Sequence, residues 1–169
     1  MAAANVAFVP AKSADIPLLR QLADEIWHAH YPAIISVEQI DYMLARMYAA
    51  DVIENELQAG TYWEMIRQDD KAVGFLSYSC SPGATQLKLH KLYLRVDHHG
   101  QGLGQASLRY LMDVAAGLHA KEISLFVNKH NTKAVRAYQR FGFTIAESMV
   151  NAFGGGFVMD DYRMTIICK

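Results

Sequence analysis

The first third of the chain carries apolar residues at the spacing of amphipathic helices. The short apolar run Val6–Val9 predicts a first strand, and Ser13 predicts the cap of the helix that follows. The apolar positions of that helix recur every three or four residues: Ile16, Leu19, Leu22, Ala23, Ile26 and Trp27. Tyr31-Pro32 ends this helix, Ser36 caps a second amphipathic helix, and residues 51–58 predict a third, shorter one.

After the predicted helices, the pattern changes to that of strands. Three segments alternate well enough between apolar and polar residues: 61–67, 72–79 and 86–94. Turn-forming residues separate these segments, as they do between strands joined by short turns. The middle of the chain therefore predicts three consecutive strands.

The last part of the chain combines two helices with three strands. A glycine-rich turn precedes a helix with an apolar stripe from Leu108 to Leu118, and Asn131 caps another helix that ends at Gly142. The strands are 122–127, 144–151 and 157–167. The order, roughly β-α-α-β-β-β-α-β-α-β-β, has too few βαβ units for a doubly wound sheet. We therefore expect a single layered α/β domain over residues 1–169.

Composition and charge narrow the classes of function. The chain has 169 residues, 52% of them hydrophobic, and a formal net charge of -1, which is ordinary for a globular protein. The near-neutral net charge argues against a nucleic-acid partner, and the scattered Lys and Arg argue against a membrane-surface partner. No apolar stretch is long enough to span a membrane, and the first residues do not resemble a signal peptide. We therefore expect a cytoplasmic protein.

Metal binding is not indicated by the cysteines and histidines. Cys80 and Cys168 are too far apart for a zinc spacing or a disulfide framework. The pairs His28/His30 and His98/His99 lack cysteine or carboxylate partners at ligand spacing. We expect no metal.

The glycine-rich turn His99–Gly104 is the strongest chemical signal. A strand delivers the chain to Gly100, Gly102 and Gly104, and a helix follows at once. Glycines let the backbone approach an anion closely, and the N–H groups at a helix start favour negative charge. The turn therefore predicts a phosphate or pyrophosphate ligand, although a glycine turn can also merely link a strand to a helix.

Two common nucleotide motifs do not fit this turn. The phosphate-binding loop of nucleoside triphosphate hydrolases needs Lys and then Ser or Thr after its last glycine, and neither follows here. A dinucleotide fingerprint needs a glycine at Gln105, and too little chain follows for the rest of such a domain. Both classes are disfavoured.

Two blocks of residues resemble the GNAT superfamily of N-acetyltransferases. The first is Leu92-Tyr93-Leu94 followed by His99-Gly100-Gln101-Gly102-Leu103-Gly104, similar to the family's acetyl-CoA motif Q/R-x-x-G-x-G/A. The second is Leu125–Asn128 followed by Asn131, Ala134, Tyr138 and Gly142-Phe143. His99 departs from the motif because Gln or Arg is usual there. A histidine can still donate to a phosphate, but its charge would make cofactor affinity depend on pH.

The resemblance covers essentially the whole chain and implies the GNAT fold. That fold has a central, twisted, mixed and mostly antiparallel sheet of about six or seven strands, flanked by about four helices. The strands 86–94 and 122–127 are expected to splay apart. Dimers are common in this fold through exchange or pairing of end strands, so a homodimer is compatible with the resemblance.

The resemblance also implies acetyl-CoA as the acetyl donor and places it on named residues. The backbone of Leu92, Tyr93 and Leu94 would pair with the pantetheine amides. Backbone N–H groups of the turn, together with Gln105, would hold the pyrophosphate: His99, Gly100, Gln101, Gly102, Leu103 and Gly104. Asn131 would contact the pantetheine arm, and Ala134 and Tyr138 would also bind the cofactor.

Direct transfer of an acetyl group needs a general acid and a deprotonated amine. Tyr138 stands where the family places its general acid, although it also fits the apolar face of its helix. The base is open: His90 is one candidate, Glu64 and the pair Asp160-Asp161 are others, and a water chain could replace them. His90 is equally compatible with a locally hydrogen-bonded, partly buried histidine.

The acceptor side points to a small cationic amine. Trp27 and Tyr31 near the early helices, with Asp160 and Asp161 near the last turn, suit an ammonium group through cation–π and charge pairing. The same aromatics could be core residues and the same acids could be solvated. The predicted activity is acetyl transfer to a primary amine, with a small amine or polyamine as acceptor. The alternatives are a protein or peptide N-acetyltransferase and a catalytically silent acyl-CoA-binding regulator.

Overall fold

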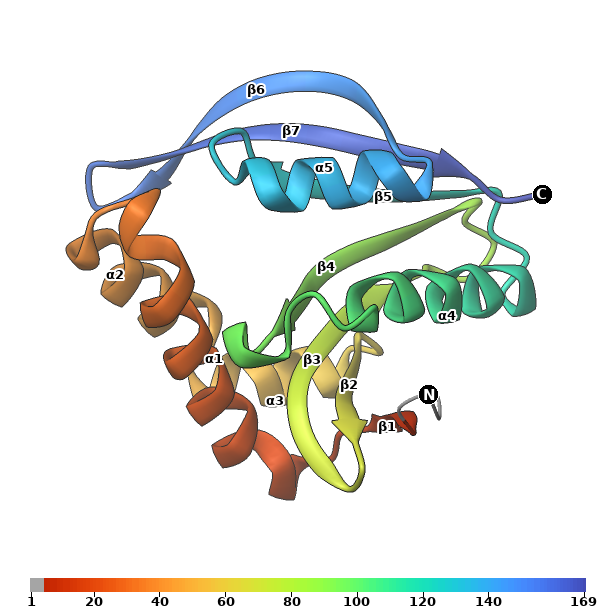
Figure 1. The fold of residues 1–169 in the computed structure, drawn as a ribbon, viewed down its shortest axis with the longest axis horizontal. Coiled ribbons are helices and arrows are strands. Elements are labelled where there is room, and N and C mark those ends of the chain that lie inside the picture. The colour runs from red at the N-terminus through yellow and green to blue at the C-terminus, as the bar shows by residue number, and fades with distance from the viewer. Residues whose placement is uncertain (1–4) are drawn as a thin grey trace. The chain divides into compact units, whose positions relative to one another are not determined.

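A computed structural model describes residues 5–169, which form five α-helices and seven strands (Figure 1). Residues 1–4 lie outside the described residues. The expectation about a signal peptide rests partly on these residues. The helices are α1 (Ile16–His30), α2 (Val37–Met47), α3 (Ala50–Gln58), α4 (Leu103–Gly117) and α5 (Thr132–Phe141). The strands are β1 (Val6–Pro10), β2 (Tyr62–Gln68), β3 (Lys71–Ser79), β4 (Gln86–Leu94), β5 (Glu122–Asn128), β6 (Thr144–Gly154) and β7 (Phe157–Ile167).

The seven strands belong to one mixed sheet, as predicted. Its order of hydrogen-bonded neighbours is β1-β2-β3-β4-β5-β7-β6. β4 and β5 are parallel, with Gln86–Leu89 paired to Glu122–Leu125, whereas β5 pairs with β7 antiparallel. The α/β fold class expected from the sequence is confirmed.

Contacts divide the chain into two compact units, each with its own core. The first comprises the described residues up to Tyr78 together with Lys91–Leu103, and the second comprises Ser79–His90 together with Gly104–Lys169. β4 therefore contributes its first half to the second unit and its last residues to the first unit. The expectation of a single domain stays a prediction.

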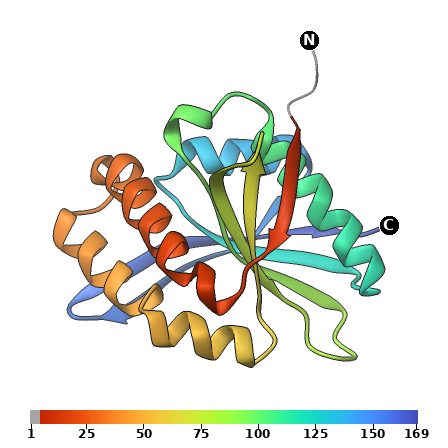
Figure 2. The same cartoon turned by 90° about the horizontal axis from the view of Figure 1, so that it is seen from below.

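The core of the first unit is built on the apolar stripe of α1 and on aromatic rings. Leu19, Leu22 and Ile26 are buried at the helical spacing that the sequence shows. The Trp27 ring lies edge-on to Tyr48, 5.9 Å away between centroids, and Tyr48 lies edge-on to Phe75 of β3 at 5.8 Å. Figure 2 shows α1, α2 and α3 gathered beside the strands β1, β2 and β3. Through Tyr48, these ring contacts connect α1 to β3 within the unit.

The core of the second unit lies against β5. Ile123, Leu125 and Val127 alternate along β5 and are all buried, as is Met164, which pairs with Leu125 from β7. Leu111 of α4 and Val135 of α5 are buried too. In contrast, most residues of β6 are exposed, and its partner is β7.

Two details of the helices differ from the sequence predictions. Ser13 does not cap α1: it begins a short 3₁₀ turn, η1 (Ser13–Asp15), and its hydroxyl donates to Glu54 Oε1 at 2.9 Å. The helix starts after this turn, so Pro17 falls where no backbone N–H is needed. The short helix expected at 51–58 is present as α3, so residues 5–169 contain five α-helices instead of about four.

Other local predictions are confirmed. Ser36 caps α2, because its hydroxyl accepts the backbone N–H of Gln39 at 3.1 Å. Asn131 caps α5, because its side chain accepts the N–H of Ala134. Gly142 ends α5 with a φ of +128°, a conformation that favours glycine. Within residues 5–169, none of the helices combines the length and apolar content that crossing a bilayer requires.

His28 ties α1 to α2 through two ring nitrogens. Its Nδ1 lies 2.9 Å from the backbone oxygen of Asp24, and its Nε2 lies 2.9 Å from Asp41 Oδ1. The Asp24 carbonyl and the Asp41 carboxylate raise the pKa of His28 above its ordinary value, against a smaller opposing effect of burial. The imidazolium is therefore the form that this geometry stabilises.

We expect His28 to stabilise the fold at acidic pH and to lose that effect as pH rises. Because the folded-state pKa is raised, the stabilisation is fully present below the unfolded value of about 6.5 and is lost as pH rises through the folded-state pKa. Melting temperatures of the wild type and of His28→Gln should differ most near pH 5.5 and converge above pH 8. The corresponding difference in the free energy of unfolding near pH 5.5 should be about 0.5 kcal/mol, because the pair is partly exposed. A gap that widens with pH would contradict this assignment.

Candidate functional site

The turn between β4 and α4 has the geometry of an anion cradle. β4 ends at Leu94, the 3₁₀ turn η3 (Val96–His98) follows, and α4 begins at Leu103. Gly100 and Gly102 have φ values of +75° and +79°, which other residues adopt only with strain. A Cβ built on either glycine would meet nothing within 4 Å, so space is open beside this backbone. The first N–H groups of a helix have no intrahelical partner, so the end of this turn offers donors to a phosphate.

His99 is anchored to the end of the strand that precedes the turn. Its Nε2 lies 2.9 Å from the backbone oxygen of Leu94, which can only accept a hydrogen bond. Nε2 must therefore carry the proton and donate it toward β4. The His99 side chain thereby fixes the loop that connects Leu94 to Gly100.

Gln101 and Gln105 also hold the neighbourhood of the turn. Gln101 accepts from the side-chain amide of Gln68 at 3.4 Å. Gln105 of α4 donates from Nε2 to the backbone oxygen of Ala137 in α5 at 3.2 Å. Because this bond links the first turn of α4 to the middle of α5, the two helices that carry the resembling blocks are neighbours in the second unit.

α5 presents Asn131, Ala134 and Tyr138 at successive turns. Asn131 is 6% exposed and has its side chain committed to the cap of the helix. Tyr138 is half-buried, and its ring lies edge-on to Phe143 at 5.6 Å between centroids. Asn131 is the N-cap of α5, and the successive spacings of three and four residues to Ala134 and Tyr138 place the three residues along one side of the helix.

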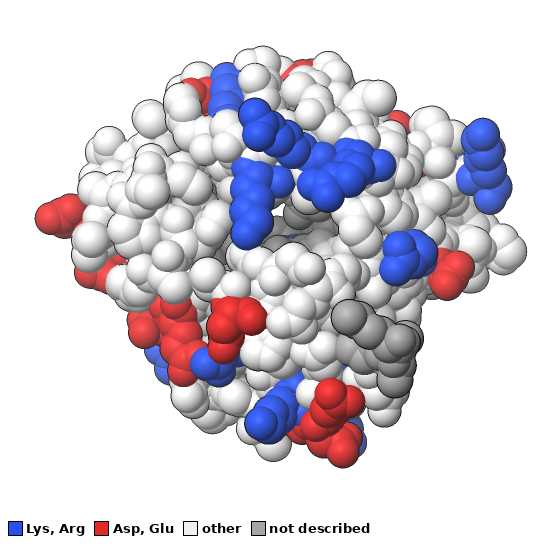
Figure 3. Space-filling view, viewed as in Figure 1, with Lys and Arg blue, Asp and Glu red and all other residues white. Residues whose placement is uncertain are grey.

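A basic face runs along α5. Lys133, Arg136 and Arg140 are exposed and lie three or four residues apart, so they project from neighbouring turns. Figure 3 shows Lys and Arg side chains gathered over this helix. α5 itself carries no acidic residue. This face therefore attracts anions, independently of the turn.

His90 lies on β4 with its ring held by a serine. Its Nε2 is 2.7 Å from the Ser79 hydroxyl, and the side chain is exposed. Glu64 of β2, the alternative base, is only 4% exposed and accepts a 2.9 Å hydrogen bond from the Tyr78 hydroxyl. His90 thus has a hydrogen-bond partner on β3 but is exposed, not partly buried, and its role as a base stays a prediction.

Trp27 and Tyr31 belong to the aromatic cluster of the first unit. Trp27 is 2% exposed and Tyr31 8% exposed, and the Tyr31 hydroxyl lies 3.1 Å from that of Tyr93 on β4. A cation of the protein itself, the Lys91 ammonium group, contacts rings of this cluster: its Nζ lies 4.8 Å from the centre of the Trp63 ring and 5.5 Å from that of Tyr48.

Lys91 is the residue near the predicted site that sequence reasoning missed. It is 7% exposed, and burial lowers its pKa, while Glu56 nearby raises it. The signal was present: Leu87, Leu89, Lys91 and Tyr93 occupy alternate positions of β4, so Lys91 falls in a row of otherwise apolar or aromatic residues. Because lysine is normally exposed, the sequence pattern did not identify Lys91 as a buried residue.

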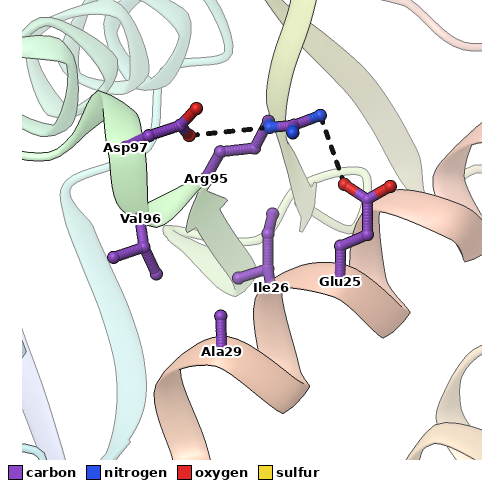
Figure 4. A pocket seen from close by; sticks show the side chains of 6 residues that line it. All are labelled: Glu25, Ile26, Ala29, Arg95, Val96 and Asp97. Carbon is purple, nitrogen blue, oxygen red and sulfur yellow. Dashed lines mark ion pairs between the residues drawn. The ribbon is translucent and has the colours of Figure 1, made fainter.

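A hollow of about 350 Å³ lies beside η3 in the first unit. Ile26 and Ala29 of α1 and Val96 of η3 give it apolar walls (Figure 4). Arg95 crosses one edge, with Nη1 at 3.2 Å from Glu25 Oε2 and Nε at 3.6 Å from Asp97 Oδ1. These ion pairs tie the segment that leads into the glycine turn to α1.

The two acids of β7 have different environments. Asp160 pairs with Lys129, whose Nζ lies 2.5 Å from Oδ1, and with His130 at 3.7 Å. Asp161 is 5% exposed. In the part of the chain that the structure describes, no three His, Cys, Asp or Glu side chains gather as a metal site would require.

Comparison with solved structures defines the class of the fold. The PaiA N-acetyltransferase of Thermoplasma acidophilum, solved with coenzyme A, superposes with a TM-score of 0.82 over 96% of this chain and 99% of that chain, at 20% identity. The spermidine N-acetyltransferase of Vibrio cholerae, solved with CoA and spermine, gives a TM-score of 0.72 over 96% and 95%, at 17% identity. The chain therefore has the fold of the GCN5-related N-acetyltransferases.

Sequence comparison gives the family itself. The sequence profile of the acetyltransferase (GNAT) family matches residues 19–143, a range that contains the glycine turn and all of α5. The chain belongs to this family of acetyltransferase enzymes. It is also 26% identical to the peptidyl-lysine N-acetyltransferase YjaB of Salmonella typhimurium over 113 residues, which are 65% of this chain and 70% of that protein.

Proposed function

We propose that this protein transfers an acetyl group from acetyl-CoA directly to a primary amine. The observation that carries the proposal is the turn after β4, where two left-handed glycines leave open space beside the start of a helix. A pyrophosphate needs such a backbone, and the exclusion of the two nucleotide motifs leaves CoA as the ligand that fits the family. The basic face of α5 supports the same choice, since CoA is a polyanion.

The roles that we propose for the chain's residues follow the resemblance to the acetyltransferase family. The backbone of Leu92–Leu94 pairs with the pantetheine amides, and the N–H groups of His99–Gly104, with Gln105, hold the pyrophosphate. Asn131 and Ala134 line the pantetheine arm on α5. Tyr138, one turn further, protonates the departing thiolate. Acetyl-CoA supplies the acetyl group as a reactive thioester.

The acceptor that we propose is a small amine or polyamine. The spermidine N-acetyltransferase with the same fold and the acids at the start of β7 support this choice. The similarity to the peptidyl-lysine N-acetyltransferase of Salmonella typhimurium favours a second candidate, a lysine side chain in a protein. Both acceptors present a primary amine, so the chemistry is shared.

Thiol release from acetyl-CoA measures this activity directly. We expect acetyl-CoA-dependent thiol release with at least one of spermidine, small monoamines and a lysine-containing peptide, and no release without an amine. The acceptor with the highest kcat/KM separates the small-amine candidate from the peptide candidate. Tight binding of acetyl-CoA without turnover on any of these amines would favour a silent regulator and would contradict the proposal.

A further inference from the structure

The two consecutive acids of β7 point to opposite faces of the sheet, because side chains alternate along a strand. Asp160 is matched by a cation, with Lys129 Nζ 2.5 Å from its Oδ1 and His130 Nε2 3.7 Å from its Oδ2. Asp161 lies on the other face, opposite Asn128 of β5 and Met149 of β6 in the register. Asp160 is therefore neutralised by an ion pair, whereas Asp161 lies on the opposite face of the sheet from that pair.

Asp161 is a buried carboxylate with an unused oxygen. Its side chain is 5% exposed, and Oδ1 is inaccessible and has no hydrogen-bond partner among residues 5–169. A buried carboxylate without a partner is costly, because the charged form has lost its water. Such groups are uncommon in folded proteins and concentrate at functional sites.

The position of Asp161 is fixed to the turn between β5 and α5. The N–H of Lys129 donates to the Asp160 carbonyl at 3.0 Å, and the N–H of Asn131 donates to the Asn128 carbonyl at 3.0 Å. Asn128 is also the residue that faces Asp161 across the ladder. Asp161 is therefore paired with the last residue of β5, Asn128, directly before the turn that leads to Asn131. In the proposed function, Asn131 contacts the pantetheine arm.

We propose that Asp161 binds the acceptor as an ammonium ion and takes one proton from it before acetyl transfer. This inference rests on the proposed function and names the base that it lacks. The carboxylate accepts the proton of R–NH₃⁺, and the amine forms its C–N bond to the thioester carbon as the C–S bond breaks. The departing thiolate takes a proton from Tyr138, the nitrogen gives its second proton to the Tyr138 phenolate, and Asp161 returns its proton to solvent.

The electrostatics around Asp161 support this role. Burial raises the pKa of Asp161, the neighbouring Asp160 raises it further, and Lys129 acts in the opposite direction. A carboxylate with a raised pKa is a stronger base than an exposed one. The strands that flank β7 carry two further acids, Glu122 on β5 and Glu147 on β6, and Glu147 pairs with Arg163 at 3.3 Å. His130 lies in the turn after β5.

The test is Asp161→Asn, measured by turnover and by thermal melting. With spermidine and a lysine-containing peptide as acceptors, we expect kcat/KM for the acceptor to fall about 100-fold or more, with the KM for acetyl-CoA within about twofold of wild type. The amide also removes a buried charge, so the melting temperature at pH 8 should equal or exceed that of the wild type. At pH 3, below the unfolded-state pKa of about 3.9, this gain should vanish.

Glu147→Gln is the matched control, because it neutralises an acid on the adjacent strand that is exposed and already paired. Its turnover should stay within about twofold of wild type. Full turnover of Asp161→Asn, or a lower melting temperature at pH 8, would overturn the role of Asp161. Absence of wild-type turnover on every amine is a separate result that concerns the proposed function, and the melting comparison still tests Asp161 in that case.

Discussion

Replacing Tyr138 by phenylalanine should reduce kcat by about 10²–10⁴-fold while acetyl-CoA still binds. The phenol would supply the proton that the thiolate needs, and phenylalanine keeps the ring but lacks the donor. The ring packs edge-on against Phe143, so the variant retains its contact in the core of the second unit. Thiol-release rates give kcat, and calorimetry with acetyl-CoA gives the affinity.

Tyr110→Phe provides the control for this variant. Tyr110 lies on α4, is partly buried like Tyr138, and has no place in the proposed chemistry. Its turnover should match that of the wild type within about twofold. If Tyr138→Phe also turned over at a near-normal rate, Tyr138 would be a packing residue and the general acid would lie elsewhere.

The largest loss of stability should follow from Gly74→Ala. A Cβ on Gly74 of β3 would lie 2.2 Å from the backbone oxygen of Tyr93 and 3.1 Å from Leu94 Cα on β4. Since backbone atoms cannot rotate away as a side-chain tip can, the two strands would have to separate. We expect a loss of about 3 kcal/mol, or roughly 6–12 °C in melting temperature.

A second glycine serves as the control for that substitution. Gly117, near the end of α4, has open space where a Cβ would stand and no left-handed φ. Gly117→Ala should leave the melting temperature unchanged or raise it, because alanine restricts the unfolded chain and favours a helix. A Gly74→Ala protein as stable as wild type would show that β3 and β4 can move apart at little cost. Weakened binding of acetyl-CoA should accompany the destabilisation, since Tyr93 and Leu94 carry the proposed pantetheine contacts.

Local signals predicted the elements well where a side chain satisfies its own backbone. Ser36, Asn131 and Gly142 mark helix ends through interactions within four residues, and each acts in the structure as the sequence indicated. Ser13 shows the limit of such reasoning. Its hydroxyl is used by Glu54, 41 residues away, and a contact of that range leaves no local pattern.

In the candidate site, too, features set by local sequence could be predicted, and features set by contacts between distant residues could not. The glycine turn and the α5 block are each a continuous stretch of sequence, so the resemblance to the family could assign both from the order of their residues. The environments of Asp160 and Asp161 could not be predicted, because they depend on which acid contacts Lys129, 31 residues earlier in the sequence. Lys91 escaped notice because charge normally predicts exposure, and only the ring cluster explains its burial.

The first unit contains a buried charge, Lys91, and exposed ion pairs, and these two kinds of interaction should respond differently to ionic strength. Dissolved ions screen the pairs of Arg95 with Glu25 and of His28 with Asp41, since those groups meet solvent. They reach the Lys91 ammonium, enclosed by Trp63 and Tyr48, far less. Concentrated salt therefore loosens the surface ties of α1 while the interaction of Lys91 with the rings persists. The stability that the Lys91–ring contacts contribute should therefore depend less on ionic strength than the contribution of the surface ion pairs.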